Sequence, residues 1–241
     1  MKTLKHIEYI LVHLDGVLLE NILGPILYSM MKSFGIPYTV EVESNILAKP
    51  LEEIGSYLRS IHGLTLSDQD LFEQYLIFRS SYEHTHSIQR QEGFIELLSL
   101  IESNHLNLLA YGGAPFEYFA KHMKGFESNF TQPMYIQTRD FRPGLLEIID
   151  QLNIKSSQIL FIDEEANVAK VAVSNQIPFI GFKKNFEYSF QTSELERLNL
   201  PYTVNQLTDI NIDLLYSIDQ AIDNSYNNIS NQNTMAQGKN I

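Results

Sequence analysis

The chain has 241 residues, of which 44% are hydrophobic, and a formal net charge of −12. This length suffices for one sizeable core and a smaller accessory domain. The absence of cysteine excludes disulfides, thiolate nucleophiles and thiolate metal sites, and is typical of a cytoplasmic protein. The acidic charge and the lack of a basic cluster longer than Lys183-Lys184 argue against a nucleic-acid partner. The apolar residues form only short runs, so no membrane partner is expected.

Four short apolar runs predict buried strands. Each run ends abruptly in polar residues or glycine, which is typical of strands buried on both faces of a parallel sheet. The predicted strands are Tyr9–Val12, Leu106–Tyr111, Ile159–Ile162 and Pro178–Phe182.

The segments between these strands predict the topology. Residues 144–152 and 166–175 have apolar residues at helical spacing, so strands and helices alternate as in a doubly wound parallel α/β sheet with right-handed crossovers. Residues 20–87 are helix-like throughout and predict a helical cap inserted after the first strand. The core is then formed by residues 1–19 and 88–223. The remaining segment, 224–241, is rich in Asn, Ser and Gln and predicts a disordered polar tail.

Polar residues and glycines follow three of the predicted strands. A doubly wound sheet binds ligands at the carboxyl ends of its strands. The first strand runs into His13 and Asp15, the second into Gly112-Gly113, and the third into Asp163-Glu164. Carboxylates at adjacent strand ends would suit Mg²⁺, and glycines allow backbone N–H groups to approach an anion.

Three segments in this order resemble the motifs of the haloacid dehalogenase-like hydrolases. YILVHLDGVLLE is similar to the first motif, a strand followed by Asp-x-Asp-Gly-Thr/Val-Leu. ESNHLNLLAYGGAP resembles the second-motif strand, and ILFIDEEANVAKVAVSNQIPFIGF resembles the fourth motif. The helical insertion matches the helical cap of the phosphatase and phosphoglucomutase-like branch. The resemblance spans roughly residues 9–202 and implies a Rossmann-like core and phosphohydrolase chemistry.

The first motif departs from the family pattern at its first acidic position. In the family, the first aspartate attacks phosphorus and the second is the general acid and base. Asp15 matches the second, whereas His13 occupies the nucleophile position. The resemblance leaves three roles open for His13: a phosphohistidine nucleophile, a transition-metal ligand, or a neutral residue in a retired position. Imidazole suits transition metals better than Mg²⁺, so weak Mg²⁺ binding is expected and a transition metal stays open.

The second and third motifs also differ from the family. Tyr111 or Gly112 stands where the family offers Ser or Thr to phosphate. No lysine is present in TRDFRPGLLEII, which leaves Arg139 and Arg142 as candidates for the phosphate-neutralising cation. The predicted phosphate-binding residues are therefore Gly112, Gly113, Arg139 and Arg142. Arginine binds phosphate through a bidentate fork, so this change alone would not abolish phosphate binding.

The fourth motif is the best preserved. Asp163 matches the metal-binding aspartate of the family, and Glu164 stands where some members carry a second aspartate. With the backbone carbonyl of Asp15, these residues are the predicted metal ligands. Asn167 occupies the more distal acidic place.

Two functions follow from the resemblance and its departures. The first hypothesis is a catalytically degenerate phosphohydrolase that binds a small phosphorylated molecule or a protein partner. The alternative is an active metal-dependent phosphatase or phosphomutase-like hydrolase that uses Asp15 and Asp163 with a metal-bound water.

Overall fold

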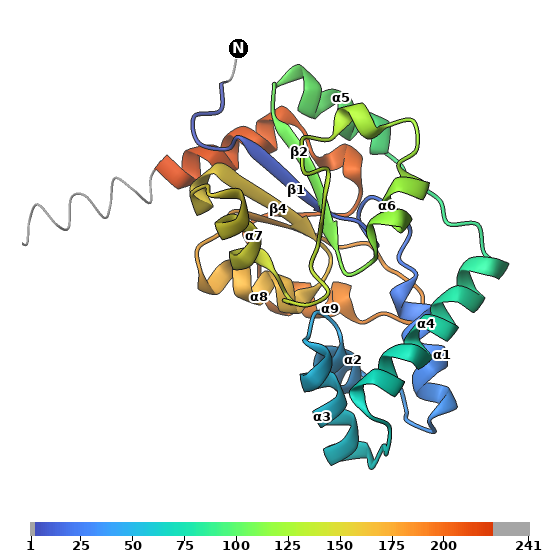
Figure 1. Cartoon of the computed structure of the whole chain (residues 1–241). Helices are drawn as coiled ribbons and strands as arrows, with labels where there is room; N and C mark the ends of the chain where they lie inside the picture. Colours follow the sequence, from blue (N-terminus) through green and yellow to red (C-terminus); the bar gives the residue numbers. More distant parts are fainter. Residues whose placement is uncertain (1–2, 224–241) are drawn as a thin grey trace, which may run out of the picture.

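The computed structural model describes residues 3–223 and shows two layers of helices around one parallel sheet, with a separate group of helices at the carboxyl edge (Figure 1). The predicted polar tail, 224–241, lies outside the described residues. Among residues 3–223, no helix is long and apolar enough to cross a membrane.

The sheet has six parallel strands in the order β3-β2-β1-β4-β5-β6. This order confirms the predicted α/β doubly wound class. Its strands are β1 (Tyr9–His13), β2 (Asn107–Gly112), β3 (Tyr135–Gln137), β4 (Ile159–Asp163), β5 (Phe179–Phe182) and β6 (Thr203–Val204). Four of them match the predicted strands within one residue at each end. The short edge strands β3 and β6 were not predicted, because two or three residues give no recognisable apolar run.

Strand β1 lies at the centre of the sheet, between β2 and β4. Its alternate side chains point to opposite faces, so Ile10 and Val12 join one apolar cluster and Leu11 joins the other. The helices that cover the two faces are α5 (Phe94–Ser103), α6 (Phe116–His122), α7 (Leu145–Leu152), α8 (Ala166–Ser174) and α9 (Gln191–Arg197), with a further helix at residues 212–223. The central position of β1 places the residues that follow it between the ends of β2 and β4.

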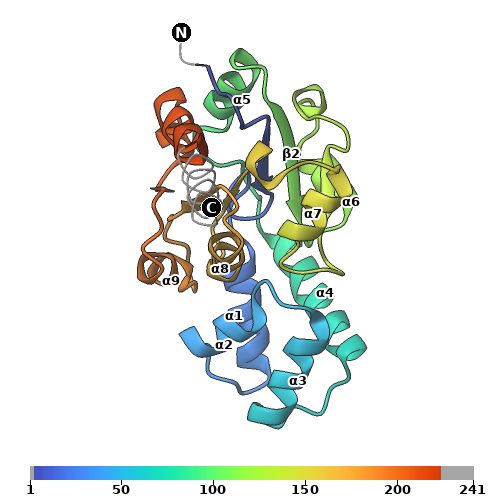
Figure 2. The ribbon, with the colours of Figure 1, turned by 90° about the vertical axis from the view of Figure 1, so that its left-hand side faces the viewer.

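The cap consists of α1 (Leu23–Ser33), α2 (Val40–Ile46), α3 (Leu51–His62) and α4 (Asp68–Thr85). These helices form a group beyond the carboxyl ends of the strands, as Figures 1 and 2 show from two directions. They have an apolar cluster of their own, which includes Met30, Met31, Leu58 and Leu71. The cap is therefore held together by its own core.

Two chain segments join the cap to the sheet, and they run side by side. The Glu20 N–H donates to the Gln89 carbonyl and the Gln91 N–H donates to the Leu18 carbonyl, each at 2.9 Å. The boundaries of the cap thus lie where the outgoing and returning segments are hydrogen-bonded to each other.

Candidate functional site at the carboxyl edge of the sheet

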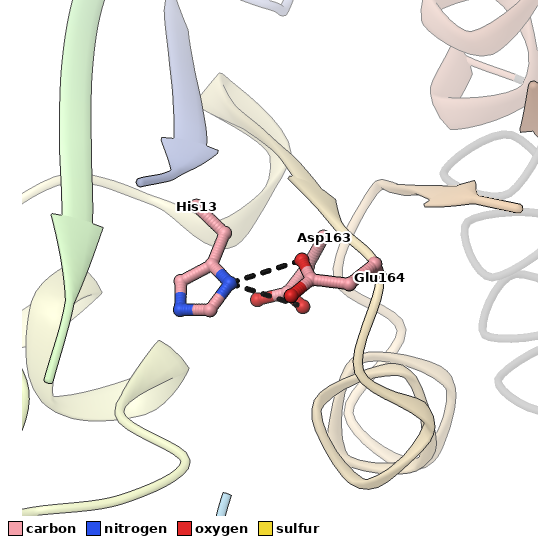
Figure 3. A group of neighbouring side chains, drawn as sticks. All are labelled: His13, Asp163 and Glu164. Carbon is pink, nitrogen blue, oxygen red and sulfur yellow. Dashed lines mark hydrogen bonds and ion pairs between the residues drawn. The ribbon is translucent and has the colours of Figure 1, made fainter. Parts of the chain in front are cut away.

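His13 ends β1 and points toward the end of β4, where it meets two carboxylates (Figure 3). Its Nδ1 lies 3.0 Å from Oε2 of Glu164 and 3.8 Å from Oδ1 of Asp163. All three side chains are at most 1% exposed. The predicted neighbours from the first and fourth motifs are thus brought together in a buried cluster.

The charge of this cluster follows from its burial and its carboxylates. Burial lowers the pKa of His13, but the adjacent Asp163 and Glu164 outweigh it and raise that pKa to about 10. Burial raises the pKa of Glu164 to about 8 against the attraction of His13. Two carboxylates, Asp163 and Glu164, stabilise the imidazolium of His13. The chain itself thus places a cation between Asp163 and Glu164.

Asp163 has hydrogen bonds to both of its carboxylate oxygens. The hydroxyl of Tyr111, from the adjacent β2, donates to Oδ2, and the backbone N–H of Glu165 donates to Oδ1 at 2.7 Å. Tyr111 is fully buried, and its ring lies 5.3 Å from that of His13. Tyr111 therefore occupies the interior of the site and does not form an exposed wall at its mouth.

Asp15 does not join the His13 cluster through its side chain. Its Oδ2 lies 3.4 Å from both Nη1 and Nη2 of Arg79, which reaches it from the cap helix α4. Arg79 also donates to the Tyr75 hydroxyl at 2.9 Å, and its guanidinium lies 4.3 Å from the centre of the Tyr118 ring. The residue that matches the family's general acid and base is thus paired with an arginine of the cap.

The two candidate arginines of the third motif lie in different surroundings. Arg142 is nearly buried, and its Nη1 lies 3.7 Å from Oε2 of Glu165, beyond hydrogen-bond distance. No described residue accepts a hydrogen bond from that buried Nη1. Arg139 is half exposed and is paired with Asp140 at 2.9 Å. Arg142 is therefore the arginine with free donor capacity inside the site.

The two glycines after β2 also differ in position. Gly113 lines the cleft, and a Cβ added to it would lie 3.3 Å from Nη2 of Arg142. Gly112 ends β2, and a Cβ added there would lie 3.4 Å from the His13 ring. Gly113 is thus the glycine that leaves room next to Arg142.

A cleft lies between the cap and the core, and its charged walls are mostly basic. Its lining includes five basic residues and one acidic residue: Lys49, Arg79, Arg139, Arg142, His13 and Asp15. The whole chain has a formal net charge of −12. Most of these basic groups are paired with carboxylates of the chain, and Arg142 has the longest such contact, 3.7 Å to Glu165.

Buried polar contacts also bind the cap to the core. The carboxylate of Glu43 in α2 is fully buried and accepts from the Gln191 amide at 2.7 Å and from the Phe190 N–H at 3.0 Å. The side-chain amide of Asn167 donates to the carbonyls of Ser44 and Leu47 at 2.8 and 2.9 Å. Asn167, at the distal acidic place of the fourth motif, thus binds cap backbone.

Neither a protein-family model nor a curated protein matches the sequence. Solved structures do match. A putative β-phosphoglucomutase from Bacteroides vulgatus has a TM-score of 0.69 at 16% identity, over 90% of each chain. A haloacid dehalogenase-like protein of unknown function from Agrobacterium tumefaciens has a TM-score of 0.60 at 16% identity, over 84% of this chain and 95% of that one.

The chain has the haloacid dehalogenase-like fold. A predicted phosphatase from Clostridium acetobutylicum also matches it, with a TM-score of 0.61 at 17% identity, over 85% of this chain and 96% of that one. The predicted resemblance in fold is therefore confirmed over most of the chain.

The haloacid dehalogenase-like fold implies Mg²⁺ at the ends of β1 and β4, and the donors found there do not fit that ion. Mg²⁺ requires oxygen ligands in octahedral geometry. His13 offers a nitrogen where the family pattern has a carboxylate oxygen, and the Asp15 carboxylate faces Arg79. His13, Asp163 and Glu164 are nevertheless a group whose ligand atoms lie within 4.8 Å of one another. An imidazole with two carboxylates is a donor set for transition metals.

Sequence reasoning missed two residues of this site. Arg79 lies 64 positions after Asp15, on a cap helix whose docking no sequence motif reveals. Its only signal is the i, i+4 spacing with Tyr75 and Glu83, which marks one face of α4. Glu43 carries no signal beyond being an acidic residue in the first turn of a helix.

Proposed function

We propose that this protein binds a small anion in the cleft between the cap and the core and does not form an aspartyl-phosphate. The observation that carries the proposal is the guanidinium of Arg142 in the cleft lining, whose contact with Oε2 of Glu165 is 3.7 Å long and leaves a donor unused. The buried Nη1 of Arg142 has an unused donor, and Gly113 leaves space beside it. An arginine with free N–H groups in a partly enclosed site favours phosphate or carboxylate.

The proposal that no aspartyl-phosphate forms rests on the residues at the nucleophile position and beside it. His13 is not a carboxylate, and its Nδ1 faces Glu164 at 3.0 Å. Asp15 could act on a substrate only after release from Arg79. A nucleophile must have a reactive lone pair directed at the substrate. The adjacent carboxylates raise the pKa of His13 to about 10, so near neutral pH both of its ring nitrogens are protonated and offer none.

Binding of inorganic phosphate, measured by calorimetry, tests the anion site. We expect wild-type protein to bind phosphate and Arg142→Met to lose at least tenfold in affinity, because the variant removes the free donor and keeps an unbranched side chain. Arg59→Met is the matched control, since Arg59 lies in the cap and pairs with Asp68 at the surface. Equal affinity in wild type and Arg142→Met would contradict the proposal.

Phosphate release from a panel of phosphorylated metabolites tests the absence of turnover. The protein is assayed with Mg²⁺, Mn²⁺, Co²⁺ and Zn²⁺ in turn, beside His13→Ala. We expect no release above background in any condition. Metal-dependent release that His13→Ala abolishes would overturn this half of the proposal.

A metal-dependent phosphatase is the second candidate function. Its support is the buried group His13, Asp163 and Glu164, whose ligand atoms are close enough for one ion. Binding of Zn²⁺ or Mn²⁺, measured by calorimetry on wild type and His13→Ala, separates the two candidates before any substrate is known. Binding that His13→Ala abolishes would favour the second candidate.

A further inference from the structure

The cleft continues into the cap, and the two halves of its wall differ in chemistry. The core contributes charged residues and backbone at the carboxyl edge of the sheet. The cap contributes mainly apolar side chains from all four of its helices, among them Leu27, Met30, Ile54, Leu58 and Phe72. Its polar lining residues are Lys49, Tyr75 and Arg79, and Arg79 faces Asp15 of the core. A site with one charged wall and one apolar wall fits a ligand with the same division.

The size of this space limits what the cap can enclose. The cavity measures about 150 Å³. An apolar cavity of that volume in a protein interior stays dry and accommodates a benzene-sized molecule. Because the charged and apolar walls enclose this volume together, the apolar part of a ligand is limited to at most about the size of one aromatic ring or a branched alkyl group.

The same wall disfavours a polyhydroxylated ligand. A hydroxyl group transferred from water into an apolar site without a hydrogen-bond partner costs about 1–3 kcal/mol by protein mutational data. The side chains of Leu27, Met30, Ile54 and Leu58 offer neither donors nor strong acceptors. The hydroxyl groups of a sugar phosphate would thus lose their hydration against these four side chains, and the polar cap residues Lys49, Tyr75 and Arg79 already have hydrogen-bond partners in the chain.

We propose that the ligand of this cleft is a small anion carrying one compact apolar group, such as an aryl or branched-alkyl phosphate or carboxylate. The anionic group lies against Arg142 and Gly113, and the apolar group lies among the cap side chains. This inference rests on the proposed anion site and adds the chemistry of the group attached to the anion.

Paired ligands test the inference on the full chain by calorimetry. Phenyl phosphate, glucose 6-phosphate and inorganic phosphate share the anion and differ in the attached group. We expect phenyl phosphate to bind at least tenfold tighter than either of the others. Similar affinities for all three would overturn the inference and leave the anion site standing.

Cavity-filling variants test whether the preference for phenyl phosphate arises from the cap side chains. Leu27→Phe and Ile54→Phe add volume from two different helices, and neither residue touches the anion site. Each is expected to abolish the tenfold preference for phenyl phosphate while inorganic phosphate binds as in wild type. Circular dichroism and urea denaturation identify a variant that has failed to fold, and the other then decides. A preference retained in a folded variant would overturn the inference.

The effect of neutral benzene on the melting temperature tests the apolar subsite separately from the anion site. Stabilisation of wild type and not of Leu27→Phe supports an apolar subsite in the cap. Benzene binding without binding of any phosphate would overturn the proposed function and, with it, an anionic ligand for this cleft. Absence of both effects would overturn the apolar subsite and the anion site together.

Discussion

Replacement of Arg79 by methionine tests how strongly the cap is fixed to the core. The Arg79 and Asp15 side chains are only 7% and 6% exposed, so water cannot replace the lost partner. Breaking a buried ion pair from one side costs roughly 3–5 kcal/mol, because a buried charge is left uncompensated. The variant also loses the hydrogen bond to the Tyr75 hydroxyl. We therefore expect the free energy of unfolding of Arg79→Met to fall by about 3–5 kcal/mol.

Urea denaturation of the variant beside two controls measures this loss. Arg59→Met removes a pair with Asp68 in which the side chains are 37% and 35% exposed, and it should cost about 1 kcal/mol or less. The double variant Arg79→Met, Asp15→Asn removes the unpaired charge and should recover part of the loss. If Arg79→Met is as stable as Arg59→Met, removal of Arg79 does not leave a costly unpaired charge on Asp15, and the reasoning is refuted.

Three further substitutions and one titration test other parts of the structure. His13→Asp places three carboxylates together at Asp163 and Glu164, so we expect a lower melting temperature that millimolar Mg²⁺ raises in the variant and leaves unchanged in wild type. Gly16→Ala should destabilise by roughly 1–3 kcal/mol, measured in urea, because Gly16 has a φ of +101° and its Cβ would collide with the Glu164 carboxylate. Asp219→Ala leaves three backbone N–H groups near the N-terminus without their acceptor and should cost about 2–4 kcal/mol in the same assay, whereas a change below 0.5 kcal/mol would contradict that role. The pKa of His13 is raised from 6.5 to about 10 in the folded protein, so its protonation stabilises the fold fully below about pH 6.5 and this contribution is lost as the pH rises through 10. NMR should show a protonated imidazole at pH 8.5. A neutral ring at that pH would contradict the raised pKa.

The predictable part of the fold is the part that is buried on both faces. Strands β1, β2, β4 and β5 are built on apolar runs; the first three end at His13, Gly112 and Asp163, and β5 is followed by Lys183. The edge strand β3 has three residues and β6 has two, and their pairing depends on tertiary contacts that a local pattern does not encode. Strand ends therefore located His13 and Asp163 correctly, because parallel strands bring their carboxyl ends to one edge.

The contacts of the site were less predictable than its position. Asp15 was expected at the position of the general acid and base, and its actual partner, Arg79, is on a helix whose orientation depends on how the cap packs. Tyr111 was placed at the end of a strand, but its hydrogen bond to Asp163 requires the register between β2 and β4 through β1. A motif specifies which residues converge, whereas the pairing of their side chains depends on packing across elements distant in sequence.

The site balances its charges with residues of the chain. Asp15 faces Arg79, Glu164 faces His13, and Glu165 faces Arg142 at 3.7 Å. A cluster of buried carboxylates is stable only if cations or metal ions neutralise it. Two of these pairs are in ordinary ion-pair contact, whereas the third leaves both oxygens of Glu165 and Nη1 of Arg142 without hydrogen bonds. An incoming anion therefore has one guanidinium to bind at low cost, and that guanidinium lies beside Gly113 at the junction of the charged and apolar walls.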